Sequence, residues 1–128
     1  MASWDDVARI ALALPEVAEG TTYGSRSWKV GGKLFVWERP LRGTELAQLG
    51  EAAPTGEIVG ARVPDEEAKH ALVESEPEIY FTTPHFDGNP SVLILLERIP
   101  VADLEEAIVE AWLCRAPKKL ADAYLAGR

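Results

Sequence analysis

Basic and aromatic residues alternate in one short stretch of the chain, residues 26–42. Five bases and one acid give this stretch a local charge of +4, although the 128-residue chain as a whole carries −8. The bases are Arg26, Lys29, Lys33, Arg39 and Arg42, and the aromatics between them are Trp28, Phe35 and Trp37. Because cations pair with phosphates and aromatic rings stack on bases, this composition is typical of a surface that binds a nucleic acid.

Two further cations stand near the C-terminus, at Lys118 and Lys119. We group them with Arg26, Lys29 and Lys33 as the candidate anion-binding residues. At physiological salt the Debye length is about 8 Å, so a local patch can act at contact even though the whole chain repels polyanions. The acidic total opposes a dedicated nucleic-acid binder. We therefore expect DNA binding to be weak and salt-sensitive.

The aromatic residues of this stretch have a second interpretation, which is structural. Trp28, Val30 and Phe35 would then pack beneath helices, while the bases reach solvent at the rim of the core. Burying such a side chain is worth about 1.5–3 kcal/mol, and stacking a base on an aromatic ring about 1–3 kcal/mol. The two energies overlap, and the frequency with which such residues are buried favours the core.

No arrangement typical of catalysis is found. Gly31-Gly32-Lys33 is not a phosphate-binding loop, because that motif requires glycine at position 27 and serine or threonine at position 34, where this chain has Ser27 and Leu34. One cysteine and two histidines are too few for a tetrahedral zinc site. Cys114 is expected in the core. We therefore expect a protein that is not an enzyme, with no cofactor and no metal.

His85 could act as a proton shuttle or contact a ligand. It lies beside Asp87 in a loop over residues 84–90 that is rich in proline and glycine. The alternative is a loop histidine that hydrogen-bonds to backbone and fixes the turn.

Length and composition indicate one domain over residues 1–128. With 47% hydrophobic residues the chain can bury a core without disulfides. The N-terminus lacks a basic, apolar leader, and no apolar run reaches the ~20 residues that a membrane span needs. We expect a soluble, cytoplasmic protein.

Periodicity predicts the elements that position these residues. Helices are expected over residues 3–14, 65–75, 103–115 and 118–126, and strands over 21–30, 33–37, 57–63, 79–83 and 91–97, with a short helical turn at 45–49 in an otherwise looped segment. Strands joined by hairpins and short loops favour an antiparallel sheet, with the helices packed on one face.

The Gly31-Gly32 pair predicts a two-residue type I′ turn between the first two strands. That turn sets Val30 opposite Lys33, Trp28 opposite Phe35, and Arg26 opposite Trp37. One face would then hold Arg26, Trp28, Val30, Lys33, Phe35, Trp37 and Arg39, and the other Ser27, Lys29, Leu34, Val36 and Glu38.

Three blocks of the sequence resemble the MmcQ/YjbR family. They are Tyr23-Gly24 with Ser27-Trp-Lys-Val-Gly-Gly-Lys-Leu-Phe35, then Thr83-Pro-His-Phe86 leading into the strand 92–96, and last Ala111-Trp112 with Ala116-Pro-Lys-Lys-Leu120. The resemblance implies a sandwich like that of frataxin and CyaY, and it implies DNA binding. It carries over no catalytic residues.

Three functions are weighed on this basis. The first is weak contact with DNA through the candidate anion-binding residues. The second is a small-molecule or protein-binding module with a pocket between the hairpin and the His85 loop, lined by Trp28, Phe35 and His85, with Trp112 as a further candidate. The third is metal binding by an acidic surface like that of frataxin. Its carboxylates would come from Asp65, Glu66, Glu67, Glu74, Glu76, Glu78, Asp103, Glu105, Glu106 and Glu110, although solvated helix faces explain most of these acids.

Overall fold

The computed structural model describes residues 2–22, 24–53 and 56–127. Its elements in chain order are α1 (Trp4–Leu12), β1 (Val17–Thr22), β2 (Ser25–Val30), β3 (Lys33–Glu38), α2 (Gly43–Leu49), the 3₁₀ turn η1 (Gly50–Ala52), β4 (Ile58–Arg62), α3 (Glu66–Ser75), β5 (Tyr80–Phe81), the 3₁₀ turn η2 (Pro84–Phe86), β6 (Ser91–Leu95), α4 (Val101–Arg115) and α5 (Lys118–Ala126). The described residues therefore have the α+β architecture that the sequence predicts.

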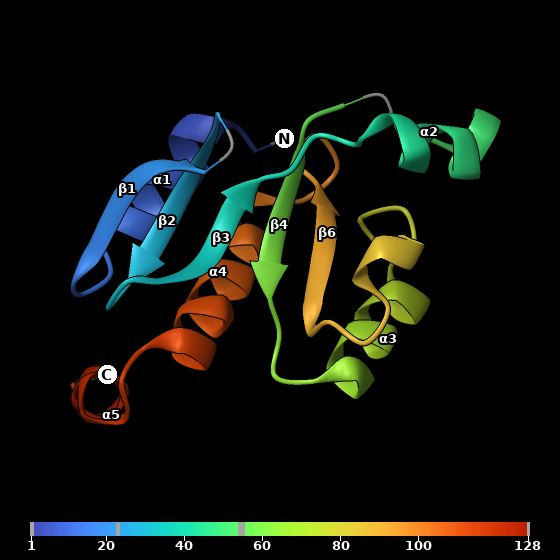
Figure 1. Cartoon of the computed structure of the whole chain (residues 1–128). Coiled ribbons are helices and arrows are strands. Elements are labelled where there is room, and N and C mark those ends of the chain that lie inside the picture. The colour runs from blue at the N-terminus through green and yellow to red at the C-terminus, as the bar shows by residue number, and fades with distance from the viewer. Residues whose placement is uncertain (1, 23, 54–55, 128) are drawn as a thin grey trace.

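The strands form one antiparallel sheet in the order β1-β2-β3-β4-β6-β5 (Figure 1). The single strand expected over residues 21–30 is in fact two strands, because β1 ends at Thr22 and pairs with Ser25 at the start of β2. Four of the six residues of β1 are exposed, and neither face of this edge strand is buried along its length. It therefore lacks the alternation of polar and apolar residues by which strands are predicted.

Local capping explains where the first helix begins. The Ser3 hydroxyl accepts a hydrogen bond from the Asp6 N–H, and the Asp6 carboxylate accepts one from the Ser3 N–H at 3.0 Å. This reciprocal pair satisfies two backbone donors at the start of α1. Asp65 likewise caps α3, by accepting from the Ala68 N–H at 2.8 Å.

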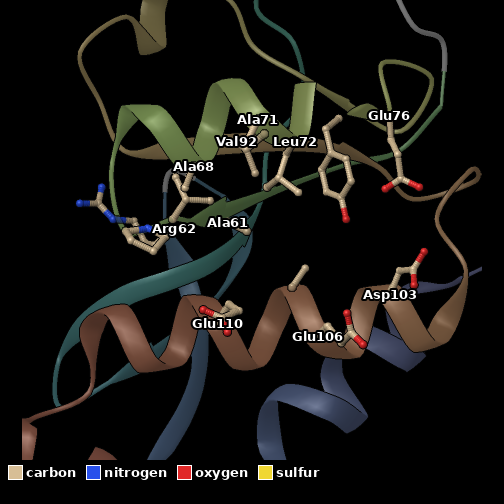
Figure 2. Close-up of a pocket in the computed structure, with 14 residues that line it drawn as sticks. Ala61, Arg62, Ala68, Ala71, Leu72, Glu76, Val92, Asp103, Glu106 and Glu110 are labelled. Atoms are coloured by element: carbon tan, nitrogen blue, oxygen red, sulfur yellow. The ribbon is translucent and has the colours of Figure 1, made fainter. Parts of the chain in front are cut away.

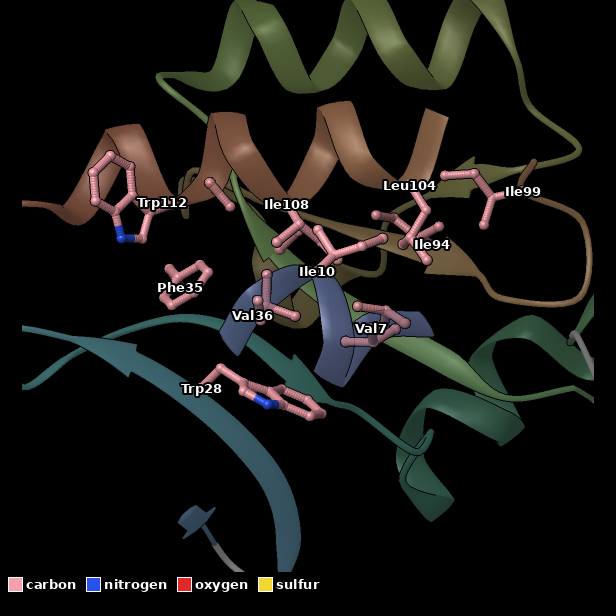
Figure 3. Close-up of a cluster of buried hydrophobic side chains, with 14 of the residues drawn as sticks. Val7, Ile10, Trp28, Phe35, Val36, Ile94, Ile99, Leu104, Ile108 and Trp112 are labelled. Atoms are coloured by element: carbon pink, nitrogen blue, oxygen red, sulfur yellow. The ribbon is translucent and has the colours of Figure 1, made fainter. Parts of the chain in front are cut away.

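The main core lies between one face of the sheet and helices α1 and α4 (Figure 3). Its largest members include Val7, Ile10, Trp28, Phe35, Val36, Ile94, Ile99, Leu104, Ile108 and Trp112. The indole N–H groups of the two tryptophans are satisfied inside the fold, Trp28 by Glu19 and Trp112 by the Pro15 carbonyl, each at 3.1 Å. The structural interpretation of Trp28, Val30 and Phe35 is thus confirmed.

A β-bulge in β3 corrects the predicted register. Gly31 and Gly32 have the positive φ angles of a type I′ turn, and Val30 pairs with Lys33 as expected. Beyond Lys29 the register shifts, so that Trp28 pairs with Val36 instead of Phe35. The extra residue places both Phe35 and Val36 in the core.

The same shift moves Trp37 to the opposite face, where it was not expected. There it belongs to a second apolar cluster built around Ile58, Phe86 and Leu93. Leu41, which precedes α2, and Phe86 of η2 pack over this cluster. The predicted arrangement, with helices packed on one face of the sheet, therefore holds for α1, α3 and α4. Residues 39–45 and η2 cover part of the other face.

A buried lysine anchors α3 to the loop after β5. The side chain of Lys69 is 1% exposed, and its ammonium donates to the carbonyls of Phe86 at 2.9 Å and Asn89 at 3.0 Å. Glu66 supplies the opposite charge at 2.8 Å. Because the charge is paired and its donors are used, burial of this ammonium is tolerated.

We predict that Gly60→Ala destabilises the fold. Gly60 pairs with Trp37 across β3 and β4, and a Cβ at this position would clash with the Trp37 ring. Because the ring is confined within the second cluster, the expected loss of unfolding free energy is roughly 1–3 kcal/mol, measured by urea denaturation. Gly20→Ala is the matched control, since a Cβ added at Gly20 would have no atom within 4 Å. Equal effects of the two substitutions would contradict this packing.

Candidate functional site

The cations expected to bind an anion are only partly available. Arg26 forms an ion pair with Glu19 at 3.2 Å and lies over the Trp28 ring, with its Cζ 5.1 Å from the ring centroid. Lys118 pairs with Asp122 at 2.7 Å. Both charges are therefore compensated locally.

Lys29, Lys33 and Lys119 are exposed, and within the described part of the chain none of them forms an ion pair. A Cβ on Gly31 would lie 3.6 Å from the Pro117 ring, so the hairpin tip lies beside the start of α5 (Figure 1). The fold thus brings the two expected basic segments to the same end of the molecule.

The expected pocket lining needs correction at three positions. Trp28, Phe35 and Trp112 are each 0% exposed and lie in the main core. Trp28 and Phe35 lie on the core side of the sheet, and Trp112 packs into the same core from α4. The indole N–H groups donate to Glu19 and to the Pro15 carbonyl. These side chains therefore serve the core and contact no ligand from solvent.

A groove nevertheless lies between the hairpin and the His85 loop, and we call it the hairpin groove. It encloses about 330 Å³, and its walls include Leu34, Trp37, Arg39, Arg42, His85 and Phe86. His85 is exposed, and its ring and that of Phe86 are arranged edge to face, with centroids 5.0 Å apart. Trp37, not Trp28 or Phe35, is thus the aromatic of the hairpin that faces this loop.

Arg39, which lines the hairpin groove, belongs to a buried ion pair. The Arg39 guanidinium lies 2.9 Å from the Glu45 carboxylate, with side chains 7% and 4% exposed. Glu45 also accepts from the Thr83 hydroxyl at 2.7 Å and from the Arg42 N–H at 3.0 Å. Burial acts to raise the pKa of Glu45, but the hydrogen bonds from Arg42, Thr83 and Arg39 outweigh it and lower the pKa below its ordinary value of 4.5.

A larger groove lies between α3 and α4, over β4 and β6 (Figure 2). We call it the α3–α4 groove. It encloses about 520 Å³. Its apolar lining consists of Ala61, Val63, Pro64, Ala68, Ala71, Leu72, Tyr80, Val92 and Ala107, and its charged lining of Arg62, Glu76, Asp103, Glu106 and Glu110. Short alanine side chains from both helices and from β4 leave the space between these elements unfilled.

The charges of the α3–α4 groove are unevenly arranged. Glu76 and Asp103 lie at one end and Arg62 at the other, with Glu106 and Glu110 along α4 (Figure 2). None of the four carboxylates forms an ion pair within the described residues. The sequence alone places these acids mostly on solvated helix faces.

The negative field of these acids acts on Tyr80, which also lines the groove. Burial, followed by the charges of Glu76, Asp103 and Glu106, raises the pKa of Tyr80 to about 12. The phenol therefore stays protonated at neutral pH and can act only as a hydrogen-bonding group, not as a base.

The spacing of residues contains a signal for this groove. Asp103, Glu106, Ala107 and Glu110 recur at i, i+3, i+4 and i+7, which places them on one face of α4. Ala68, Ala71 and Leu72 follow the same rule on α3. The spacing does not predict that this face of α3 and this face of α4 point toward each other.

Neither a metal centre nor a membrane-spanning helix is found in the described ranges. No three His, Cys, Asp or Glu side chains gather there closely enough to hold a metal ion. In the same part of the chain, every helix is too short or too polar to cross a membrane.

The chain belongs to the YjbR family, whose model matches residues 12–114. Curated relatives from Mycobacterium bovis and Mycobacterium tuberculosis are 55% identical and are described as uncharacterised proteins; the match covers 98% of this chain and 98% of theirs. A crystal structure of a Deinococcus radiodurans protein with the DUF419 domain, the same family, is similar with a TM-score of 0.66. It is 18% identical, and the match covers 88% of this chain and 78% of that one. The frataxin-like part of the fold expectation stays a prediction.

We predict that Glu45→Gln destabilises the protein by about 3 kcal/mol near neutral pH, because it leaves the buried Arg39 charge without its partner. The folded-state pKa of Glu45 is lowered, so its stabilisation is fully present above 4.5 and disappears as the pH falls through the folded value. Urea denaturation at several pH values should show the difference between Glu45→Gln and the parent shrinking in acid. Glu51→Gln, at an exposed site, is the control. A difference that stays constant with pH would contradict this assignment.

Proposed function

We propose that this protein is a binding module without catalytic activity, whose ligand is a small organic cation held in the α3–α4 groove. The observation that carries the proposal is an apolar groove surrounded by four carboxylates without ion-pair partners in the described chain. The small-molecule function considered from sequence is thus retained, with its location moved from the hairpin groove.

Size and lining support this choice. Ligand pockets usually enclose about 300–1,000 Å³ and are mainly apolar, with a few polar groups that orient the ligand. The α3–α4 groove encloses about 520 Å³, and its floor is made by alanine, valine and leucine side chains. An alkyl or aromatic body would cover this floor and release the water on it.

The charged residues around the groove determine the sign of the charge that a ligand must carry. Two unit charges 4 Å apart interact by about 1 kcal/mol in water and about 4 kcal/mol near a protein surface. Four carboxylates oppose one guanidinium, that of Arg62, around the groove. An ammonium group is therefore attracted to the end formed by Glu76 and Asp103, where Arg62 is most distant (Figure 2).

The groove supports binding more readily than chemistry. Tyr80, with a pKa of about 12, can donate a hydrogen bond but takes up no proton at neutral pH. The lone Cys114 has a pKa raised by burial first and by Glu110 second, so its thiol stays protonated and a poor nucleophile. Neither group is activated for covalent catalysis.

We predict that hexylammonium binds this groove and that hexanol, its uncharged analogue, binds at least several-fold more weakly. The double variant Glu76→Gln with Glu106→Gln should weaken hexylammonium binding roughly tenfold, because it removes two favourable charge interactions. Affinities are measured by titration followed with NMR, at low and at physiological salt.

Glu78→Gln with Glu105→Gln is the matched control, because these exposed acids neighbour Glu76 and Glu106 but do not line the groove. The control pair removes the same net charge from the same region of the chain. Equal loss of affinity in the two double variants, or equal binding of hexylammonium and hexanol, would overturn the proposal.

Nucleic-acid binding is a second candidate function, supported by one specific observation. Lys29, Lys33 and Lys119 carry no ion pair in the described chain, and the adjacency of Gly31 to Pro117 brings their segments together. With Arg26 and Lys118 compensated, few cations remain for phosphates. Such a surface would bind weakly and in strong dependence on salt.

For this candidate we predict that labelled single-stranded and duplex DNA bind measurably at low salt, and that Lys29→Ala with Lys33→Ala abolishes the binding. Fluorescence anisotropy at low and high salt is the measurement. Arg98→Ala is the control, since this exposed base lies outside the hairpin. No binding at low salt, or binding that the lysine variant leaves intact, would remove DNA from consideration.

A further inference from the structure

A second cavity adjoins the Arg62 end of the α3–α4 groove. It encloses about 320 Å³ between the residues that follow β4 and the last turns of α4. Arg62, Glu110, Cys114 and Arg115 are its polar or titratable side chains. The two cavities share Arg62, Val63, Pro64 and Glu110, so they adjoin along this edge.

Two arginines line this cavity, Arg62 and Arg115. Arg62 donates through Nη1 to Asn89 at 3.2 Å and to Ser91 at 3.3 Å, and these are neutral acceptors. Its buried Nε has no partner, and neither does the buried Nε of Arg115. In the described part of the chain, neither guanidinium forms an ion pair.

This arrangement is unfavourable as it stands. A buried donor without an acceptor costs about 1–3 kcal/mol. The two like charges also oppose each other: burial, and then the charge of Arg115, lower the pKa of Arg62. Glu110 lines the cavity but pairs with neither arginine, and leaves a net charge of +1 for the three groups. Elsewhere in this acidic chain, Arg26 forms an ion pair with Glu19, and Arg39 forms one with Glu45.

We infer that the cavity between Arg62 and Arg115 is an oxyanion site that takes a carboxylate or phosphate group. A guanidinium donates charge-assisted hydrogen bonds to the oxygens of such a group, and Asn89 and Ser91 accept only from Nη1 of Arg62. An oxyanion between the two guanidiniums accepts from their remaining Nη donors and removes the repulsion between the two cations.

We call the α3–α4 groove and the adjoining cavity together the channel. If the proposed function also holds, on which this step rests, one ligand can occupy both parts of the channel. An ammonium group at the Glu76 end and an oxyanion at the Arg115 end require a molecule with opposite charges at its two ends. An apolar chain must connect them over the alanine floor. The ligand class is then an ω-amino acid or ω-amino phosphate.

Arginine Nε–H resonances in NMR test the oxyanion site directly. Hexanoate and inorganic phosphate are titrated separately at constant ionic strength, and the stronger of the two identifies the preferred oxyanion. The Nε–H signals of Arg62 and Arg115 should shift with either anion. Arg115→Gln should weaken binding about tenfold or more, because it removes charge-assisted hydrogen bonds. Arg98→Gln, which removes an exposed charge outside the cavity, should leave it unchanged.

The alkylation rate of Cys114 provides an independent measurement, because Cys114 is the only cysteine of the chain. The charges of Arg62 and Arg115 favour its thiolate, against the larger effect of burial. A bound oxyanion cancels these charges, so alkylation of Cys114 by iodoacetamide should slow when phosphate is added. In Arg115→Gln the same addition should leave the rate unchanged.

The outcomes separate the two proposals. Absence of Nε–H shifts, or equal affinity of Arg115→Gln and the parent, overturns the oxyanion site whatever hexylammonium does. Binding of hexanoate without binding of hexylammonium supports the oxyanion site and removes the cation proposal. If both bind, 6-aminohexanoate should bind more tightly than either, and the gain should disappear in Arg115→Gln and in the Glu76→Gln, Glu106→Gln variant.

Discussion

The buried ammonium of Lys69 determines where α3 can lie. It holds the helix to the carbonyls of Phe86 and Asn89, and so to the sheet edge formed by β5 and β6 instead of to α4. Ala68 and Ala71 then face Ala107 across a gap that their short side chains do not fill. The α3–α4 groove is thus a consequence of a polar anchor on one side of the helix and of small residues on the other.

Charge is distributed over this framework in separate regions. Carboxylates without partners in the described chain gather along α4 and at Glu76, whereas the guanidiniums of Arg62 and Arg115 gather at the far end of the same channel. Around the hairpin the pattern differs, since Arg26 and Arg39 are held by Glu19 and Glu45. The α3–α4 groove is the better-supported ligand site because it combines carboxylates that form no ion pair in the described chain with an apolar surface, whereas Lys29 and Lys33 are exposed cations without such a groove.

Much of the fold follows from local rules in the sequence. The Ser3 cap, the Gly31-Gly32 turn and the apolar run after Ser91 act over a few residues, and the structure confirms them. The bulge at Phe35 cannot be predicted from the sequence pattern, because it depends on tertiary packing that buries both Phe35 and Val36 in one core. The channel cannot be predicted from the sequence for a related reason. Helical spacing shows the acidic face of α4, but only tertiary packing shows that it faces the alanines of α3.

The most direct test of this account is NMR of the protein with ¹³C-labelled alanine methyl groups, titrated with hexylammonium. The account predicts shifts at Ala68, Ala71 and Ala107, and contacts between these methyls and the alkyl chain. The exposed Ala47 and Ala123 should not respond. Shifts absent from the three groove alanines, or spread equally over all five, would show that the groove between α3 and α4 is not where the ligand binds.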